Sequence, residues 1–209
     1  AAYIVQQMAD FKSGARGTSV PKRLPTTAMI SLARAVTSDE VAAAAAYFSA
    51  IPPRRSIRVI ETATVPKTSV AGWILAVDES GVREPIGARI IEVPEDLEQF
   101  EHRDSRAGFI VYAPIGSLRK GEALAATGGE SGGGLRTVPC AICHGPELKG
   151  LGPVPGIAGR SPSYIVRQLW DFQHGARAGT RSVLMRPTVE RLTLDDMIAL
   201  AAYLADLAP

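Results

Sequence analysis

One helical unit occurs twice in this 209-residue sequence, and this repeat limits how the chain can fold more than any other feature. The stretch YIVQQMADFKSGAR, which starts at Tyr3, and the stretch YIVRQLWDFQHGAR, which starts at Tyr164, share nine of fourteen residues. The 23-residue segments that start at Met29 and Met185 share seven residues, including both methionines. Because unrelated amphipathic helices would not keep this order, we infer a duplicated unit of helix, loop, methionine and helix.

Each copy has the pattern of two amphipathic helices. In the second copy, Ile165, Leu169 and Phe172 fall at helical spacing on one face, and Gly175 provides a C-terminal stop. Thr193 then precedes two acidic residues, which is typical of an N-cap followed by a first helical turn. The sequence therefore predicts mainly α units at both ends of the chain.

The sequence between the two copies has a different pattern. The short stretches SIRVIE, GWILAV, ARIIEV and GFIVYA are rich in β-branched residues and bounded by Pro, Gly or Asp, which is typical of strands. We predict three parts: a partial helical unit (1–53), a β-rich segment (54–116) and a larger helical unit (117–209). The middle part is either a connector packed against the basic first unit or a docking surface, because residues 59–116 carry ten acidic and five basic side chains.

The two cysteines of the chain lie close together in the motif CAICH, at Cys140 and Cys143, and His144 follows directly. A structural zinc site needs four ligands, and neither of the other two histidines stands at a ligand-pair spacing. A thioredoxin-like redox pair belongs to a βαβ setting, and a disulfide across so small a loop would stabilise little. C-x-x-C-H is the signature of covalent haem attachment, in which both cysteines bond to the haem and the histidine binds its iron.

A second iron ligand is expected at Met185, 41 residues after the motif histidine. Met185 is followed by Pro187, and we predict that it lies in a loop, whereas methionines on helical stripes usually fill a core. Met8 and Met197 fall on such stripes. A histidine and a methionine together would fill the coordination sphere of the iron and raise its reduction potential, which favours electron transfer. The alternative is a haem enzyme or gas sensor with an exchangeable distal ligand.

From residue 117 to its end, the chain resembles a class I c-type cytochrome domain, and in particular one half of the tandem, two-haem periplasmic cytochromes. The stretches that carry the resemblance are CAICHG, GPVPGIAGRSPSYIVRQLWDFQHGAR and MRPTVERLTLDDMIALAAYLADL. Residues 1–53 are similar to the back half of the partner domain and contain no C-x-x-C-H motif. The resemblance covers about 140 residues and does not extend to residues 54–116.

The resemblance implies further contacts with the haem. The carbonyl group of Pro155 would accept the ring N–H of the proximal histidine, with Pro153 as the reserve candidate. Tyr164 and Arg177 would contact the haem propionates. We expect one haem c in this chain. Met29 would face a second haem only if an upstream segment carried another attachment motif.

The resemblance also implies an electron-transfer protein rather than an enzyme, either a carrier or the cytochrome subunit of a redox complex. We expect redox proteins as partners and the periplasm as the location. The net charge of +2 does not favour nucleic-acid binding, and the longest apolar run is too short to span a bilayer, although a membrane-bound partner complex would fit. Because the sequence starts without methionine, we expect a removed leader or a longer chain, and the repeat favours the second.

Overall fold

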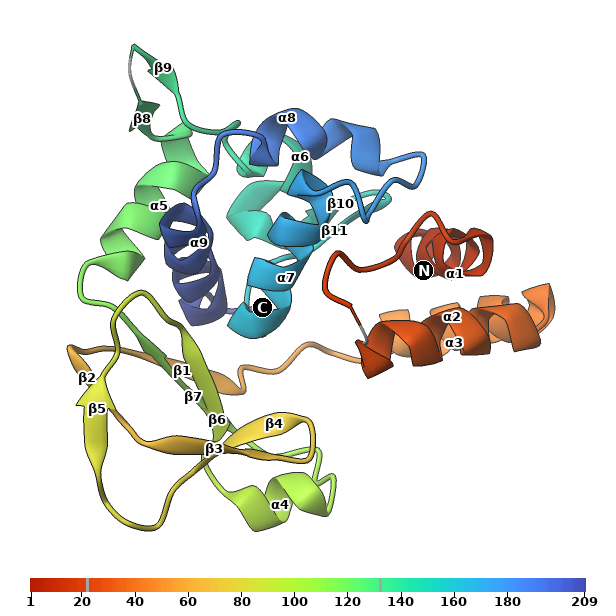
Figure 1. Cartoon of the computed structure of the whole chain (residues 1–209). Coiled ribbons are helices and arrows are strands. Elements are labelled where there is room, and N and C mark those ends of the chain that lie inside the picture. The colour runs from red at the N-terminus through yellow and green to blue at the C-terminus, as the bar shows by residue number, and fades with distance from the viewer. Residues whose placement is uncertain (22, 132) are drawn as a thin grey trace.

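The computed structural model describes residues 1–21, 23–131 and 133–209, and it is mainly helical with a small β-rich part (Figure 1). The fold class predicted from the sequence is therefore confirmed. The first group of helices comprises α1 (Ala2–Ser13), α2 (Leu24–Ala35) and α3 (Ser38–Ala50). The second comprises α5 (Ser117–Thr127), α6 (Ala141–His144), α7 (Pro162–Gln173), α8 (Arg186–Val189) and α9 (Leu194–Asp206).

The internal repeat has a structural counterpart in two pairs of helices. α1 corresponds to α7, and α3 corresponds to α9. Both α3 and α9 begin with a threonine N-cap and a capping box, in which Thr37 pairs with Glu40 and Thr193 pairs with Asp196. The second helix of each copy therefore starts through the same local hydrogen bonds.

The segments that follow α1 and α7 meet in a reciprocal contact. The amide of Gly17 donates to the carbonyl of Ala176, and the amide of Ala178 donates to the carbonyl of Ala15, each over 2.7 Å. These bonds flank an antiparallel bridge between Arg16 and Arg177, which are themselves equivalent in the repeat. The two copies are thus joined as related halves.

The methionines of the two copies lie in different local structures. Met29 lies within α2, whereas Met185 lies at a turn between the 3-10 helix η2 (Ser182–Leu184) and α8. The segment around Met185 is therefore more ordered than the loop predicted from the sequence. Pro187 accounts for this difference, because proline in the first turn of α8 has a backbone angle suited to starting a helix.

The β module, residues 54–116, contains a three-stranded sheet with the order β1 (Ile57–Glu61), β7 (Phe109–Ala113) and β6 (Ile91–Pro94). β1 and β7 are parallel, and β6 is antiparallel to β7. The predicted strand stretches contain β1, β4 and β7, and they contain β6 except for its last residue, Pro94. The remaining elements are the hairpin of β3 (Thr68–Ala71) and β4 (Ile74–Val77), the ribbon of β2 (Thr64–Pro66) and β5 (Arg83–Pro85), and helix α4 (Leu97–Glu101).

The β module packs against the second helical group. Ile57 of β1 and Val111 of β7 form a buried apolar cluster with Ala205 of α9. β6 contacts α7, and the module also has an apolar core of its own around Val65 and Val93. The connector hypothesis placed the module against the first unit, whereas these contacts run to α9 and α7.

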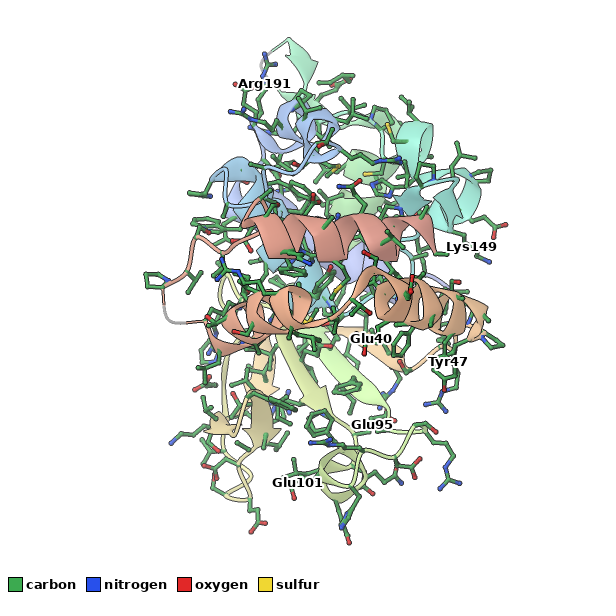
Figure 2. All side chains as sticks on the ribbon, turned by 90° about the vertical axis from the view of Figure 1, so that its right-hand side faces the viewer. Glu40, Tyr47, Glu95, Glu101, Lys149 and Arg191 are labelled. Carbon is green, nitrogen blue, oxygen red and sulfur yellow. The ribbon has the colours of Figure 1, made fainter. Side chains whose placement is uncertain are left out.

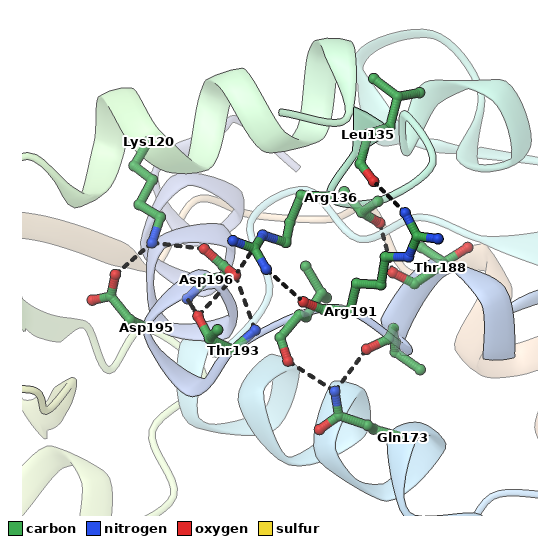
Figure 3. Close-up of polar contacts among 12 residues, drawn as sticks. Lys120, Leu135, Arg136, Gln173, Thr188, Arg191, Thr193, Asp195 and Asp196 are labelled. Atoms are coloured by element: carbon green, nitrogen blue, oxygen red, sulfur yellow. Dashed lines mark hydrogen bonds and ion pairs between the residues drawn. The ribbon is translucent and has the colours of Figure 1, made fainter. Parts of the chain in front are cut away.

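Helices α5 and α9 cross at a very short distance. Gly121 of α5 makes this approach possible, because an added Cβ would overlap the carbonyl oxygen of Ala199 and lie 2.6 Å from the Cβ of Tyr203. Lys120 of α5 forms ion pairs with Asp195 and Asp196 at the start of α9 (Figure 3). Among the described residues, no helix has both the length and the apolar composition that crossing a bilayer requires.

Candidate functional site

A cavity of about 430 Å³ lies within the second helical unit and extends to α1 of the first. Its walls contain all four predicted residues of the haem-attachment and ligand set, namely Cys140, Cys143, His144 and Met185. Most of the remaining wall is apolar, with contributions from Ile165, Leu169, Phe172, Leu192, Leu200 and Leu204. An apolar cavity of this size with a few polar groups is typical of a cofactor site.

The two cysteines lie on one short helical turn. Cys140 is the N-cap of α6, and the amide of His144 donates to the carbonyl of Cys140 over 2.9 Å. Both thiols are free, with Cys140 half-buried and Cys143 exposed. Burial raises the pKa of the Cys140 thiol to about 11, and the neighbouring Cys143 adds to the increase. The two thiols therefore lie one helical turn apart.

The ring of His144 is buried, and Pro155 fixes its orientation. The Nδ1 atom lies 2.7 Å from the carbonyl oxygen of Pro155, in the hairpin of β10 (Gly150–Leu151) and β11 (Val154–Pro155). Because a carbonyl can only accept, Nδ1 carries the proton and the lone pair lies on Nε2. Burial lowers the pKa of His144, although the hydrogen bond to Pro155 opposes this effect. Pro153, the reserve candidate, lines the same cavity.

Met185 is half-buried, packs against the apolar core and lines the cavity. The segment around it is held from two sides. Thr137 donates a hydrogen bond of 2.7 Å to the carbonyl of Thr188, and Gln173 of α7 donates to the carbonyls of Val189 and Leu192 over 2.7 and 2.8 Å (Figure 3). These bonds fix the backbone that carries the thioether.

Two buried arginines, one from each copy, also line the cavity. Arg16 is 9% exposed and Arg177 is 7% exposed. Arg177 donates to Gln7 and Gln168 over 2.7 and 2.9 Å, and Arg16 donates to Gln7, Gln168 and Tyr164. All of these acceptors are neutral, and in the described part of the chain neither guanidinium forms an ion pair. Since a buried charge is costly without a counter-charge, the site suits an anionic group in the cavity.

The predicted propionate contacts fall on different sides of this network. Arg177 lines the cavity, whereas Tyr164 is not among the residues of its wall. The Tyr164 hydroxyl instead accepts a hydrogen bond of 3.0 Å from Arg16. The sequence analysis missed the residues that the first copy contributes to the wall, which are Tyr3, Gln6, Gln7, Asp10, Ala15 and Arg16. The repeat contained the relevant signal, because Tyr3 corresponds to Tyr164 and Arg16 corresponds to Arg177.

Met29 lines a separate cavity of about 290 Å³ together with Phe11, Arg16, Tyr164 and Asp171. This cavity is related to the larger one by the repeat, since each copy lends its first helix to the wall of the other. Neither cysteine lies in its lining. The structure thus brings Met185, but not Met29, together with the C-x-x-C-H motif.

The donor set of the larger cavity fits haem c. The two thiols on one helical turn match the two vinyl groups of a haem, and a neutral imidazole and a thioether are known ligands of haem iron. The apolar wall with its two buried arginines suits a flat ring that carries carboxylates. A fold of helices around such a donor set defines a c-type cytochrome.

Comparison with known proteins places the chain among the same class. No protein-family model matches. Cytochrome c-552 of Acidithiobacillus ferridurans is 40% identical over 68 residues, which is 32% of this chain and 28% of that protein. The cytochrome subunit of sulfide dehydrogenase from Chlorobaculum tepidum is 33% identical over 79 residues, which is 38% of this chain and 69% of that protein. The match to cytochrome c-552 thus spans less than a third of that relative.

The fold also resembles that of a solved tandem cytochrome. The structure of cytochrome c4 from Acidithiobacillus ferrooxidans aligns with a TM-score of 0.60 and 22% identity, and the alignment covers 99% of this chain and 83% of that one. The chain therefore belongs to the class I c-type cytochromes and has the fold of their tandem members. The expectation of haem c as cofactor is confirmed.

Proposed function

We propose that this cytochrome transfers electrons through one haem c, attached by Cys140 and Cys143 and ligated by His144 Nε2 and Met185 Sδ. The observation that carries this proposal is the contact between His144 Nδ1 and the Pro155 carbonyl, 2.7 Å long, which leaves Nε2 as the metal-binding nitrogen. When bound, the haem supplies a one-electron ferric–ferrous couple.

The protein residues provide orientation, exclusion of water and charge balance. Pro155 holds the imidazole in one tautomer, and the hydrogen bonds of Thr137 and Gln173 hold the segment of Met185. The apolar wall keeps water away, which limits solvent rearrangement between oxidation states. Arg16 and Arg177 offer buried positive charge to the haem carboxylates, and Tyr164 acts through its hydrogen bond to Arg16.

We place the protein in the periplasm, with other redox proteins as its electron donor and acceptor. Support for redox partners comes from the relative named as the cytochrome subunit of sulfide dehydrogenase, and the periplasm is the location that the resemblance to the tandem c-type cytochromes implies. A partner complex held at the membrane is compatible with this proposal. In this proposal the haem unit comprises residues 117–209. The partial helical unit comprises residues 1–53, and the β module between them, residues 54–116, is an accessory part.

The test is the variant Met185→Ala, with Met29→Ala as a matched control at the repeat-equivalent position. Met185→Ala should abolish the ferric sulfur-to-iron charge-transfer band and lower the reduction potential, because the thioether stabilises ferrous iron. Met29→Ala should leave both unchanged. An unaltered band in Met185→Ala would refute the ligand assignment. Rapid binding of carbon monoxide or cyanide by the unmodified resting protein would instead favour the enzyme or gas-sensor alternative.

A further inference from the structure

Of the three long helices of the haem unit, two begin without an acidic residue in their first turn. These are α5 and α7, whereas α9 starts with Asp195 and Asp196 and its own capping box. The first amides of a helix have no partner within the helix, and its N-terminus carries partial positive charge. α5 and α7 therefore need acceptors, preferably anionic ones, from elsewhere in the chain.

Glu92 of β6 reaches the N-terminus of α7. Its Oε2 atom accepts hydrogen bonds from the hydroxyl of Ser161 over 2.7 Å, from the amide of Ser163 over 3.4 Å and from the hydroxyl of Ser163. Ser161 is the N-cap of α7, and its hydroxyl oxygen accepts from the amide of Tyr164. Because Pro162 has no N–H, Ser161 and Glu92 together satisfy the free amides of the first turn.

Glu61, the last residue of β1, reaches the N-terminus of α5 in the same way. Its Oε1 atom accepts from the amide of Leu118 over 2.8 Å, and Leu118 is the second residue of the helix. At the opposite pole, Arg55 donates to the carbonyl of Asp206, the last residue of α9, over 3.1 Å. The β module thus supplies negative groups to two helix N-termini and a positive group to one helix C-terminus.

We propose that Glu61 and Glu92 are positioning residues for the haem cavity, and that the β module is a brace for the haem unit rather than a detachable connector. This inference rests on the proposed haem site. Ile165, Leu169 and Phe172 of α7 line the cavity, while α5 packs on α9, whose Leu200 and Leu204 line it too. A shift of α5 or α7 would therefore loosen the apolar wall.

The direction in which the reduction potential changes in a Glu61 or Glu92 variant distinguishes a positioning role from a purely electrostatic one. Removal of a negative charge favours the ferrous state through space, so a purely coulombic effect raises the potential. A loosened wall admits water, which stabilises the more highly charged ferric state and lowers the potential. A positioning role therefore predicts a decrease where charge alone predicts an increase.

The experiment compares Glu92→Gln and Glu61→Gln with Glu101→Gln in the full holoprotein. Glu101 lies on α4 at the far end of the module and is exposed (Figure 2). The two cap variants should each lower the thermal unfolding midpoint by about 2–4 °C and lower the reduction potential. Glu101→Gln should change neither. The double variant Glu92→Gln, Ser163→Ala should lower the unfolding midpoint by less than the sum of the two single variants, because each substitution removes the same contact.

The inference would be overturned if Glu92→Gln and Glu61→Gln had the same unfolding midpoint and reduction potential as Glu101→Gln. It would also be overturned if either cap variant raised the reduction potential. A preparation without attached haem would refute the proposed function instead. In that preparation an unchanged unfolding midpoint of Glu92→Gln would still overturn the brace, since the caps do not depend on iron.

Discussion

Replacement of Gly121 by alanine is expected to destabilise the protein, although alanine is the better helix former. In the interior of a helix, alanine is favoured over glycine by about 1 kcal/mol. At this position the added methyl group would overlap the Ala199 carbonyl of α9 and approach Tyr203 to 2.6 Å. One of these neighbours is backbone, so rotation of a side chain cannot remove the overlap, and the two helices must separate.

Overpacking of this kind costs about 1–3 kcal/mol, and a backbone obstacle places Gly121→Ala at the upper end of the range. After the gain in helix propensity, the net loss in the free energy of unfolding is about 1–2 kcal/mol. For a chain of this length, that loss corresponds to an unfolding midpoint lower by about 3–6 °C.

Thermal unfolding followed by circular dichroism measures this effect, with Glu122→Ala as the control. Glu122 is the next residue of the same helix and is exposed, so alanine there adds no atoms to the crossing. We expect its midpoint to stay within about 1 °C of the unmodified protein. If Gly121→Ala melts at or above the midpoint of the unmodified protein, the close crossing of α5 and α9 is not what determines glycine at this position.

Two further predictions concern charge. Arg177→Gln removes a buried positive charge from the cavity and should lower the reduction potential by about 40 mV, which is on the order of 1 kcal/mol. The control Arg181→Gln removes an exposed charge and should change the potential less. Equal shifts of the two variants in a redox titration would contradict the role of burial. Burial alone would raise the pKa of Asp196, but hydrogen bonds from Lys120 and Thr193 hold it below the usual value. The stability that Asp196 provides, roughly 1–2 kcal/mol, is therefore complete above about pH 4 and lost as the pH falls below it. In urea unfolding, Asp196→Asn should differ from the unmodified protein at pH 7 and converge with it in acid, and a constant difference would contradict this account.

Local signals predicted most of the helical architecture and the core of the site. The C-x-x-C-H motif places Cys140, Cys143 and His144 on one turn whatever surrounds them, and the repeat fixed the order of the helices. Four strand patterns in the sequence also correspond to β1, β4, β6 and β7. In the β module, β2, β3 and β5 were missed. β2 and β5 have only three residues each and contain proline, which is unfavourable inside a sheet.

The remainder depends on contacts between distant parts of the chain. Arg16 and Tyr3 line the cavity only because the first copy docks on the second, which neither local pattern specifies. Likewise, nothing in the local sequence distinguishes Glu61 and Glu92 from ordinary strand residues, and only the packing of the β module on α9 and α7 brings their carboxylates to helix N-termini. Sequence patterns predicted the elements, while the long-range packing decided which side chains complete the site.

The central claim is that one haem is covalently bound to Cys140 and Cys143. Intact mass of the protein matured with haem-attachment machinery, combined with its pyridine haemochrome spectrum, tests this claim most directly. We predict the polypeptide mass plus one haem, a spectrum with two thioether bonds to the porphyrin, and loss of the added mass in the Cys140→Ser, Cys143→Ser double variant. A colourless protein with the mass of the bare polypeptide would contradict the account.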